Sequence, residues 1–323
     1  NYITYDRSVP TITTAAIASN NTTDDILAVP GNTVTLTFIS LEDIQTPSVT
    51  IATQVATVTA GSNAKHWSAA YVMTQNESNG TVAFEITYMD LASNAGTAQT
   101  DLINDADGAV TFDKSQPTLS AVSLTSDNSI DPTRGREGSI ITLEFSANEE
   151  LNPAQVAVTI AGNNATGANA PGIYIAWNNT SEVWRASYTL STADYPGQSD
   201  IQIPFTIDYE DMNGYDGTQV TNLTPGVVEF IFDRNNPTIT TYTAASSSGT
   251  NFAKAGDIIT LTLTANEDLD EPVITIAGHT KAEGVVAINQ GGNVQTWTAT
   301  YTMQATDDDI TAIASTLSFT DMA

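Results

Sequence analysis

The residues of this sequence with the greatest chemical potential are acids that recur in register. An Asp opens each of three similar segments, a Glu lies in a later turn, and a second Asp follows a later strand. Carboxylates from separate loops at one pole of a domain are ligands that calcium prefers. The pattern therefore predicts calcium as a cofactor. The candidate ligands are Asp6, Glu42 and Asp90; Asp113, Glu149 and Asp211; and Asp233, Glu267 and Asp321.

Two observations keep a simpler interpretation of these acids open. The sequence has no compact Asp-x-Asp-x-Asp-Gly loop, and Asp307-Asp308-Asp309 is a plain acidic run. An Asp that opens a segment can instead cap a turn or pair with the basic residue beside it. These basic neighbours are Arg7, Lys114 and Arg234.

Residues that could support catalysis are sparse. The sequence has two histidines, His66 and His279, and it has no cysteine. Thiolate nucleophiles, thiolate metal sites and disulfides are therefore excluded. The sequence also contains no Gly-x-Ser-x-Gly elbow and no phosphate-cradling glycine loop. We therefore expect that the protein is not an enzyme.

The charge balance excludes two further classes of partner. Nine Lys and Arg residues face 37 Asp and Glu residues, which gives a formal net charge of −28 at pH 7. Such a surface repels nucleic-acid phosphates and anionic membranes. No run of 18 or more apolar residues occurs, so membrane insertion is not expected either. The hydrophobic fraction of 41% is high enough to form ordinary cores.

The segments that position the acids are copies of one unit. Each begins with an aromatic residue, an Asp, a basic residue and a Pro-Thr pair, and Asp113 and Asp233 mark the second and third copies. Successive opening Asp residues lie 107 and 120 positions apart, which is the size of one immunoglobulin-like sandwich. The expected domains are an orphan strand at 1–6, repeats at 7–113 and 114–233, and an incomplete repeat at 234–323.

Within each copy the same strand patterns recur in the same order. Alternating runs such as Thr33-Val34-Thr35-Leu36-Thr37-Phe38 predict strands with one buried face. Later in each copy a Trp precedes a Tyr by four positions, which places both rings on one face of a strand. We expect these rings to fill the cores: Trp67 and Tyr71, Trp184 and Tyr188, and Trp297 and Tyr301. Trp177 falls outside the pattern and, with Tyr174, is the candidate for an exposed contact.

These features resemble the immunoglobulin-like (Ig-like) tandem repeats of large bacterial and archaeal cell-surface proteins. The resemblance is carried by the Asp-Arg/Lys-x-x-Pro-Thr opening, the Asn-Glu-Asp/Glu-Leu turn, the Val-Thr-Ile-Ala-Gly strand and the Asp-Met-x-Gly loop, and it covers nearly the whole chain. The first copy departs most, with Leu41-Glu42-Asp43-Ile44 as its turn. The resemblance implies an all-β fold of tandem sandwiches, an extracellular or cell-surface location, and cations that stiffen adjacent domains.

Eight Asn-x-Ser/Thr sequons occur, close to the number that chance produces in a chain so rich in Ser and Thr. Their positions, mostly in expected loops, are compatible with N-linked glycans on an exported protein. The candidate sites are Asn20, Asn21, Asn76, Asn79, Asn164, Asn178, Asn179 and Asn222.

The two ends of the sequence match each other. The third copy reaches Asp321 without the loop and closing strand that follow Asp90 and Asp211, while Tyr2, Ile3, Thr4 and Tyr5 resemble a closing strand. The partner of the open edge is therefore either a flanking repeat of a longer array or residues 1–6 of another copy. The leading functional expectation is a structural subunit of an extracellular filament or surface array. The alternatives are a calcium-stiffened adhesin stalk and a carbohydrate-binding module.

Overall fold

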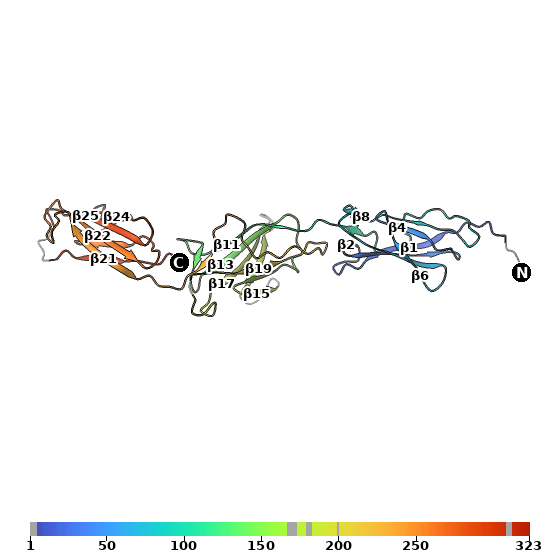
Figure 1. Cartoon of the computed structure of the whole chain (residues 1–323), viewed down its shortest axis with the longest axis horizontal. Coiled ribbons are helices and arrows are strands. Elements are labelled where there is room, and N and C mark those ends of the chain that lie inside the picture. Colours follow the sequence, from blue (N-terminus) through green and yellow to red (C-terminus); the bar gives the residue numbers. More distant parts are fainter. Residues whose placement is uncertain (1–4, 167–172, 179–182, 199, 308–311) are drawn as a thin grey trace. The chain divides into compact units, whose positions relative to one another are not determined.

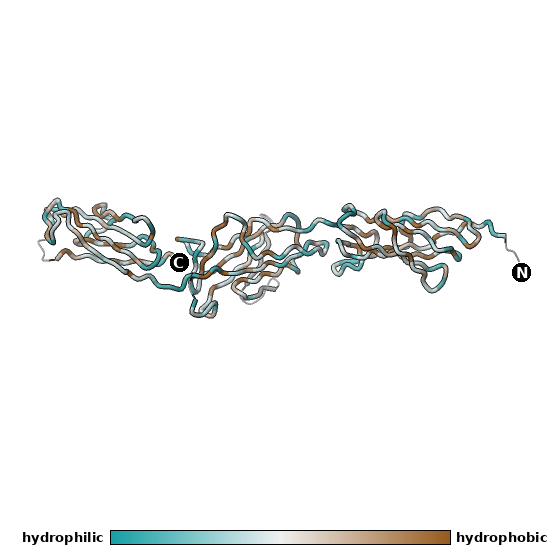
Figure 2. Tube along the Cα trace, in the orientation of Figure 1, coloured by the Kyte–Doolittle hydropathy of each residue, from teal (hydrophilic) through white to brown (hydrophobic). Residues whose placement is uncertain are grey.

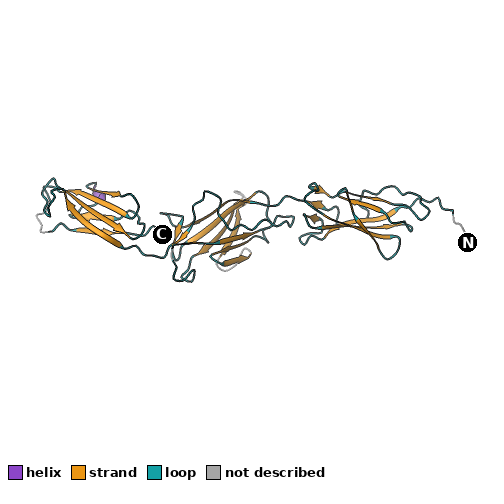
Figure 3. Cartoon of the chain, in the orientation of Figure 1, coloured by secondary structure: helices purple, strands orange, loops and turns teal. Residues whose placement is uncertain are grey.

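The protein is built almost entirely from short β-strands (Figures 1 and 3). The computed structural model describes residues 5–166, 173–178, 183–198, 200–307 and 312–323, with the backbone alone described at 164–166 and 173–178. Within these residues the single helical element is the 3₁₀ turn η1, Lys281–Glu283. The abundance of Val, Ile and Thr favours this outcome because β-branched side chains suit a pleated, half-buried surface. The all-β expectation is confirmed.

The first repeat folds as a sandwich of two main β-layers. One sheet has the order β1-β3-β7-β6, and a second has the order β5-β4-β9. A short ladder, β2-β10-β8, extends the second layer, and β10 runs parallel to β2 but antiparallel to β8. The bounds are β1 Ile12–Ser19, β2 Leu27–Ala28, β3 Thr33–Ser40, β4 Ser48–Ile51, β5 Gln54–Val55, β6 Thr57–Ala60, β7 His66–Val72, β8 Gly80–Thr81, β9 Phe84–Thr87 and β10 Thr111–Phe112.

This strand order identifies the repeat as an Ig-like sandwich. The spatial order of the first, second, fifth and fourth long strands in one sheet is the A-B-E-D arrangement of that fold. Alternation on β3 buries Val34, Leu36 and Phe38 and leaves the intervening threonines at the surface. These side chains pack in one core with Ile51 and Ile86 from the opposite layer. Figure 2 shows the same contrast between hydrophobic strands and hydrophilic turns along the chain.

The second repeat has the same three sheets in the same order. They are β11-β13-β17-β16, β15-β14-β19 and β12-β20-β18, again with β20 parallel to β12. The repeated topology follows from the repeated sequence pattern. The bounds are β11 Leu119–Ser126, β12 Arg134–Gly135, β13 Ile140–Ala147, β14 Ala157–Ile160, β15 Asn163–Thr166, β16 Ile173–Asn178, β17 Val183–Thr189, β18 Ile201–Gln202, β19 Phe205–Asp208 and β20 Ile231–Phe232.

The third repeat contributes a four-stranded sheet, β21-β22-β25-β24, and the pair β23-β26. Its core includes Leu261, Leu263, Ile276 and Trp297. The chain therefore carries tandem Ig-like sandwiches. The bounds are β21 Ile239–Ser246, β22 Ile258–Ala265, β23 Val273–Ile276, β24 Val286–Gln290, β25 Thr296–Thr302 and β26 Ser315–Ser318.

The chain divides into two compact units whose boundary passes through the second repeat. One unit contains residues 1–122, 144–185 and 205–224, and the other contains 123–143, 186–204 and 225–323. The first repeat and its junction with the second therefore lie inside one unit, and the third repeat lies inside the other. Among the described residues, no helix is long and apolar enough to span a bilayer.

Candidate metal centre

The Asp that opens each repeat accepts a backbone hydrogen bond from its own turn, and in the second and third copies its amide also donates to the preceding repeat. Its Oδ1 accepts a hydrogen bond from the amide two residues later, at 2.8 Å for Asp6, 2.8 Å for Asp113 and 2.9 Å for Asp233. The amide of Asp113 also donates to the carbonyl of Ala28 at 2.9 Å, beside β2. The turn-capping role considered from the sequence is therefore present in all three copies. It leaves the second carboxylate oxygen available for other contacts.

Two of the three basic neighbours, Lys114 and Arg234, contact groups of the preceding repeat. Lys114 Nζ donates to the carbonyl of Gln75 at 3.3 Å. The guanidinium of Arg234 donates to the carbonyls of Asp194 and Tyr195, and it lies over the ring of Phe232 at 5.6 Å from the centroid. These contacts hold Lys114 and Arg234 against the repeats that precede them in the chain.

The Asp that follows the later strand is directed inward by its loop. Asp211 Oδ1 accepts amide hydrogen bonds of 2.8 Å from both Asn213 and Tyr215, and the whole residue is 1% exposed. Gly217 permits the close approach of this loop to Tyr209, since a Cβ at position 217 would lie 2.0 Å from the ring. Gly96 and Tyr88 have the same relationship in the first repeat.

The structure brings six of the nine predicted ligands together in two clusters. Ligand oxygens of Asp6, Glu42 and Asp90 all lie within 4.8 Å of one another, as do those of Asp113, Glu149 and Asp211. Each cluster takes one acid from the segment that opens the repeat, one from the turn after its second long strand, and one from the later loop. Three carboxylates from separate loops at this spacing match the oxygen-rich donor set that calcium takes.

The carboxylates of the second cluster repel one another, and the protein does not satisfy all of their oxygens with hydrogen bonds. Asp211 Oδ2 is buried and has no hydrogen-bond partner, whereas Asp113 Oδ2 accepts from the Asn213 side-chain amide at 2.9 Å. Burial, followed by the charges of Asp211 and Asp113, raises the pKa of Glu149. Burial likewise raises the pKa of Asp211, and the charge of Asp113 adds to that effect. A cation at this point would satisfy the unpartnered oxygen and relieve the repulsion.

The first cluster is better satisfied by protein donors alone. The side-chain amide of Asn94 donates to Asp90 Oδ2 at 2.7 Å, and its backbone amide donates to Oδ1 at 2.8 Å. Burial pushes the pKa of Asp90 upward, but these hydrogen bonds outweigh it and lower the pKa. The two clusters therefore share a layout but differ in their need for a cation.

The acids of the third repeat are arranged differently. Asp233, Glu267 and Asp321 do not form a cluster of the same tightness among the described residues. Arg134 lies beside them instead, with its Nη1 3.6 Å from Asp233 Oδ2 and its Nη2 3.2 Å from Asp268 Oδ2. In the first repeat Leu27 holds the position of Arg134 beside the closing strand. The Arg134 guanidinium is therefore particular to the junction between the second and third repeats, which we call the second joint.

Arg134 neutralises this joint only in part. Glu267 Oε1 is buried without a hydrogen-bond partner. Burial, then the charges of Asp233, Asp321 and Asp200, raise the pKa of Glu267 to about 7. Asp200 occupies the position that Asn79 has in the first repeat, where the Asn79 amide donates to Asp113 at 2.9 Å. The second joint therefore replaces an amide donor with a further acid.

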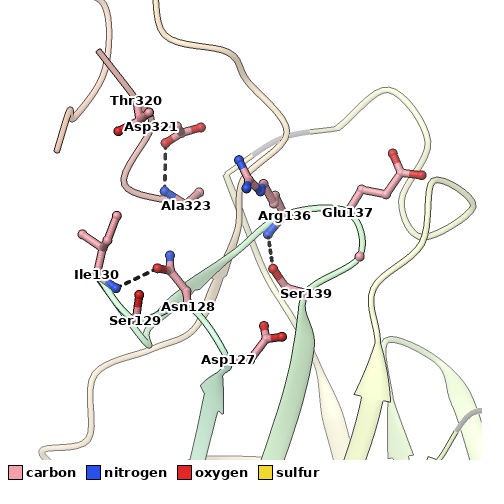
Figure 4. A pocket seen from close by; sticks show the side chains of 11 residues that line it. Asp127, Asn128, Ser129, Ile130, Arg136, Glu137, Ser139, Thr320, Asp321 and Ala323 are labelled. Atoms are coloured by element: carbon pink, nitrogen blue, oxygen red, sulfur yellow. Dashed lines mark hydrogen bonds between the residues drawn. The ribbon is translucent and has the colours of Figure 1, made fainter. Parts of the chain in front are cut away.

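Asp321 also borders a hollow of about 530 Å³ in the same unit (Figure 4). Its Oδ1 accepts from the amide of Ala323 at 2.9 Å, and the side-chain amide of Asn128 donates to the carbonyl of Met322 at 2.6 Å. Arg136 and Glu137 line the other side. These contacts fix the loop after β26 at the pole of the third repeat.

A second acid recurs in each repeat at a position that the sequence motifs do not mark. The hydroxyl of Tyr71 donates to Glu77, that of Tyr188 to Asp194 and that of Tyr301 to Asp307, always six residues along the chain. The same acids accept an amide three residues before them, from Thr74, Ser191 and Gln304. These pairs hold a turn closed, and their hydrogen bonds occupy carboxylate oxygens that a cation would otherwise need. The six-residue Tyr-to-acid spacing was the signal that could have revealed them.

The recurring Trp residues lie in the cores. Trp67, Trp184 and Trp297 are buried, and the indole of Trp184 stacks on Phe145 at 6.2 Å between centroids. Tyr301 is buried as well, whereas Tyr71 and Tyr188 are half-buried. The side chains of Trp177 and Tyr174 lie outside the described residues, so the exposed-contact hypothesis stays a prediction.

The histidines take part in ordinary polar contacts. His279 contacts Glu283 at 3.0 Å and Asp307 at 3.2 Å and stacks on Tyr301. His66 contacts Asn63 at 2.7 Å. Neither of these contacts includes a Ser, Thr or Cys nucleophile. The expectation that the protein is not an enzyme remains a prediction.

The candidate glycosylation sites fall into two groups. Asn20, Asn76, Asn79 and Asn222 are exposed and Asn21 is half-buried. The side-chain amides of two of them hold contacts, because Asn21 donates to Asn213 O at 2.8 Å and Asn79 donates to Asp113 Oδ1 at 2.9 Å. A glycan on either of the latter two would displace contacts at the junction of the first two repeats. Asn179 and the side chains of Asn164 and Asn178 lie outside the described residues.

Comparison with known proteins adds weak likenesses of architecture. No family model matches this chain, and no curated protein matches it. Similar solved structures include a chimeric titin Z1Z2 tandem, with 11% identity over 70% of this chain and 100% of that chain and a TM-score of 0.25. A marsupial T cell receptor covers 94% of this chain and 99% of its own at 9% identity and a TM-score of 0.23.

The extracellular region of plexin A4 is a further similar structure. It has 14% identity over 91% of this chain and 21% of its own, with a TM-score of 0.23. The Ig-like assignment of this protein rests on the strand order within its own sandwiches.

Proposed function

We propose that this chain is a structural segment of an extracellular filament or surface array, in which divalent cations stiffen the joints between Ig-like repeats. Calcium is the cation that the donor set favours. The stalk of a large surface adhesin performs the same mechanical task, and a cation-stiffened joint serves both. The net charge of −28 suits a protein exposed to a medium that contains calcium.

One observation carries this proposal. Asp113 follows the closing strand of the first repeat, yet its carboxylate lies within 4.8 Å of ligand oxygens of Glu149 and Asp211 in the second. A cation bound there would couple a linker residue to the next sandwich and so restrict bending at the joint. Because Asp211 Oδ2 is buried and unpartnered, the protein alone leaves the site electrostatically incomplete.

Direct hydrogen bonds already define this joint. Gln75 Nε2 donates to the hydroxyl of Tyr215 at 2.6 Å, and Gln116 Nε2 donates to the carbonyl of Asp216 at 2.9 Å. Asn21 donates to the carbonyl of Asn213, in the loop that also carries Asp211. A cation would therefore rigidify a joint whose partners are already in register, at a small further cost in conformational entropy.

The proposal is tested by calcium titration of the whole chain. Calorimetry and thermal melts with calcium and with chelator are expected to show saturable binding and a higher Tm in calcium. Small-angle scattering is expected to show a narrower distribution of interdomain distances with calcium. A matched variant, Glu85→Gln, removes an exposed acid from β9 outside the clusters and is expected to behave as the parent. Identical melts with and without calcium would overturn the proposal.

A further inference from the structure

Two asparagines that each precede a glycine contact the same carboxylate. Asn79-Gly80 and Asn213-Gly214 are the two Asn-Gly pairs of the sequence. Asn79 Nδ2 donates to Asp113 Oδ1 at 2.9 Å, and Asn213 Nδ2 donates to Asp113 Oδ2, also at 2.9 Å. Both oxygens of Asp113 therefore accept a side-chain amide at the junction between the first two repeats, which we call the first joint.

An Asn-Gly pair contains both groups that a deamidation requires. The backbone nitrogen of the glycine attacks Cγ of the asparagine and closes a succinimide ring, because glycine has no Cβ to block the approach. The Cγ–Nδ2 bond breaks, and the side-chain nitrogen leaves as ammonia with the proton of the glycine amide. Water then opens the ring at Cγ to give aspartate, or at the main-chain carbonyl to give isoaspartate. Either product has a carboxylate in place of the amide, and the reaction needs no oxidant or reductant.

The two pairs differ in the space around them. Asn79 is exposed, Gly80 has a φ of +118°, and a Cβ at Gly80 would meet nothing within 4 Å. Asn213 is half-buried, and a Cβ at Gly214 would lie 2.7 Å from Thr23 Oγ1. Ring closure requires the side chain to rotate toward the glycine nitrogen. We therefore expect Asn79 to react before Asn213.

Hydrogen bonds hold the side chain of Asn79 while the first joint is closed. Besides its contact with Asp113, its Nδ2 donates to Ser115 Oγ at 2.9 Å, and its Oδ1 accepts the amide of Lys114 at 2.9 Å. These contacts must break before Cγ can reach the nitrogen of Gly80. The rate of the reaction therefore follows how often the joint opens locally.

The second joint has an acid at the same position. Asp200 holds the place of Asn79, directly before the short strand that pairs with the closing strand, and Asn235 Nδ2 donates to Asp200 Oδ2 at 3.1 Å. Ser115 holds the place of Asn235, two residues after the opening Asp. Its hydroxyl can donate to a carboxylate as well as accept from an amide. An acid at position 79 is therefore compatible with the fold of the joint.

We propose that Asn79 and Asn213 deamidate, and that the new carboxylates convert the first joint from one closed by hydrogen bonds into one closed by a divalent cation. The inference rests on the proposed function for the nature of the cation. Each conversion removes an amide donor from Asp113 and places a negative charge within hydrogen-bond distance of it. Asp211 Oδ2 is already buried without a partner in this cluster, so a bound cation is the interaction that offsets the added repulsion.

Storage of the whole chain tests the reaction itself. The purified protein is incubated at neutral pH in heavy-oxygen water, and peptide mass spectrometry locates each new carboxylate by its label. Asn79 is expected to convert several times faster than Asn76, an exposed asparagine of the same loop that precedes Glu77. Asn213 is expected to convert after Asn79. Conversion of Asn79 no faster than that of Asn76 would overturn the proposal, as would a glycan on Asn79 Nδ2, which blocks the leaving nitrogen.

Variants that carry the product test its consequence. Asn79→Asp and Asn213→Asp are each expected to lower the Tm in chelator and to bind calcium about tenfold more tightly than the parent, because a charge is added beside the cluster. Asn222→Asp adds the same charge at an exposed position outside the first joint and is expected to behave as the parent. A lower Tm without a gain in calcium affinity would overturn the proposal, since the carboxylate would then only damage the joint. Variants indistinguishable from the parent would overturn it too.

The outcome separates from the test of the stiffened joints. A parent that binds calcium but keeps both amides on storage would leave the proposed function standing and sink the deamidation. A freshly purified parent that binds no calcium, while its stored form and Asn79→Asp do bind it, would do the reverse.

Discussion

The hydroxyl of Tyr301 lies 2.9 Å from both carboxylate oxygens of Asp307, six residues later in the chain. The same oxygens accept the amide of Gln304 and approach His279 Nε2. The hydrogen bonds from the Tyr hydroxyl and from the turn amide to one acid recur in each repeat. We call this arrangement the clamp, and its recurrence makes it a structural part of the unit. It also separates the acids that close turns from those that gather at the joints.

The clamp predicts how Tyr301 titrates. Burial, and then the hydrogen bond and charge of Asp307, raise the pKa of Tyr301 to about 12. Asp307→Asn is expected to lower this pKa because the negative charge is removed while the burial remains. NMR titration of ring-labelled tyrosine measures the change. Asp194→Asn provides the control, since it should shift Tyr188 and leave Tyr301 unmoved; an unaltered Tyr301 in Asp307→Asn would contradict the prediction.

The second cluster predicts a substitution whose effect changes sign with calcium. Asp211→Asn keeps an oxygen for the amides of Asn213 and Tyr215 but removes the charge that repels Asp113 and Glu149. In chelator the variant is expected to melt at or above the parent temperature, because its free energy of unfolding gains up to about 1 kcal/mol. In calcium it is expected to melt below the parent, since a ligand is lost. Thermal melts in both buffers measure the crossover, with Glu85→Gln as control. A variant that is less stable in both buffers by the same amount would argue against a cation.

The second joint predicts a stability that falls as the pH rises. The pKa of Glu267 is raised from 4.5 to about 7, so the folded state holds a proton that the unfolded state releases. The stability contribution is therefore highest below pH 4.5 and declines until about pH 7. Glu267→Gln is expected to match the parent at low pH and to exceed it near neutrality by on the order of 2 kcal/mol.

Melts of the parent and Glu267→Gln across this pH range, in chelator, measure the difference. Asp270→Asn alters a nearby acid on the same turn and should keep the parental pH dependence. Parallel curves for the parent and Glu267→Gln would show that Glu267 does not titrate in this range.

The loop that directs Asp211 inward leaves no room for a side chain at position 217. Gly217→Ala places a Cβ 2.0 Å from the ring of Tyr209, so the ring or loop must shift. A loss of about 1 to 3 kcal/mol is expected, as for other overpacked sites. Gly292→Ala is the matched control, because its Cβ would meet nothing within 4 Å. Chemical denaturation measures both variants, and equal stabilities would refute the steric account.

Much of the fold could be predicted from the sequence because its signals are local. Alternation of apolar and polar residues at Thr33–Phe38 is a property of one strand, and its burial pattern follows from the pleat alone. The repeats were visible as a spacing of openings, turns and Trp-Tyr pairs. The recurring acids were likewise found by their register. Their division into clusters could not be foreseen, because it depends on which loops meet at a pole.

The sequence by itself determined an all-β chain of repeated units, the position of each acid within its unit, and the match between residues 2–6 and the closing strands. Only the tertiary structure decided which acids carry unmet charge. Asn94 satisfies Asp90, whereas Asn213 is turned toward Asp113 and leaves Asp211 Oδ2 without a donor. Arg134 enters the second joint from a strand more than 90 positions before Asp233. A pKa or a cation site depends on distances of a few ångströms between such distant segments, and local sequence patterns do not encode those distances.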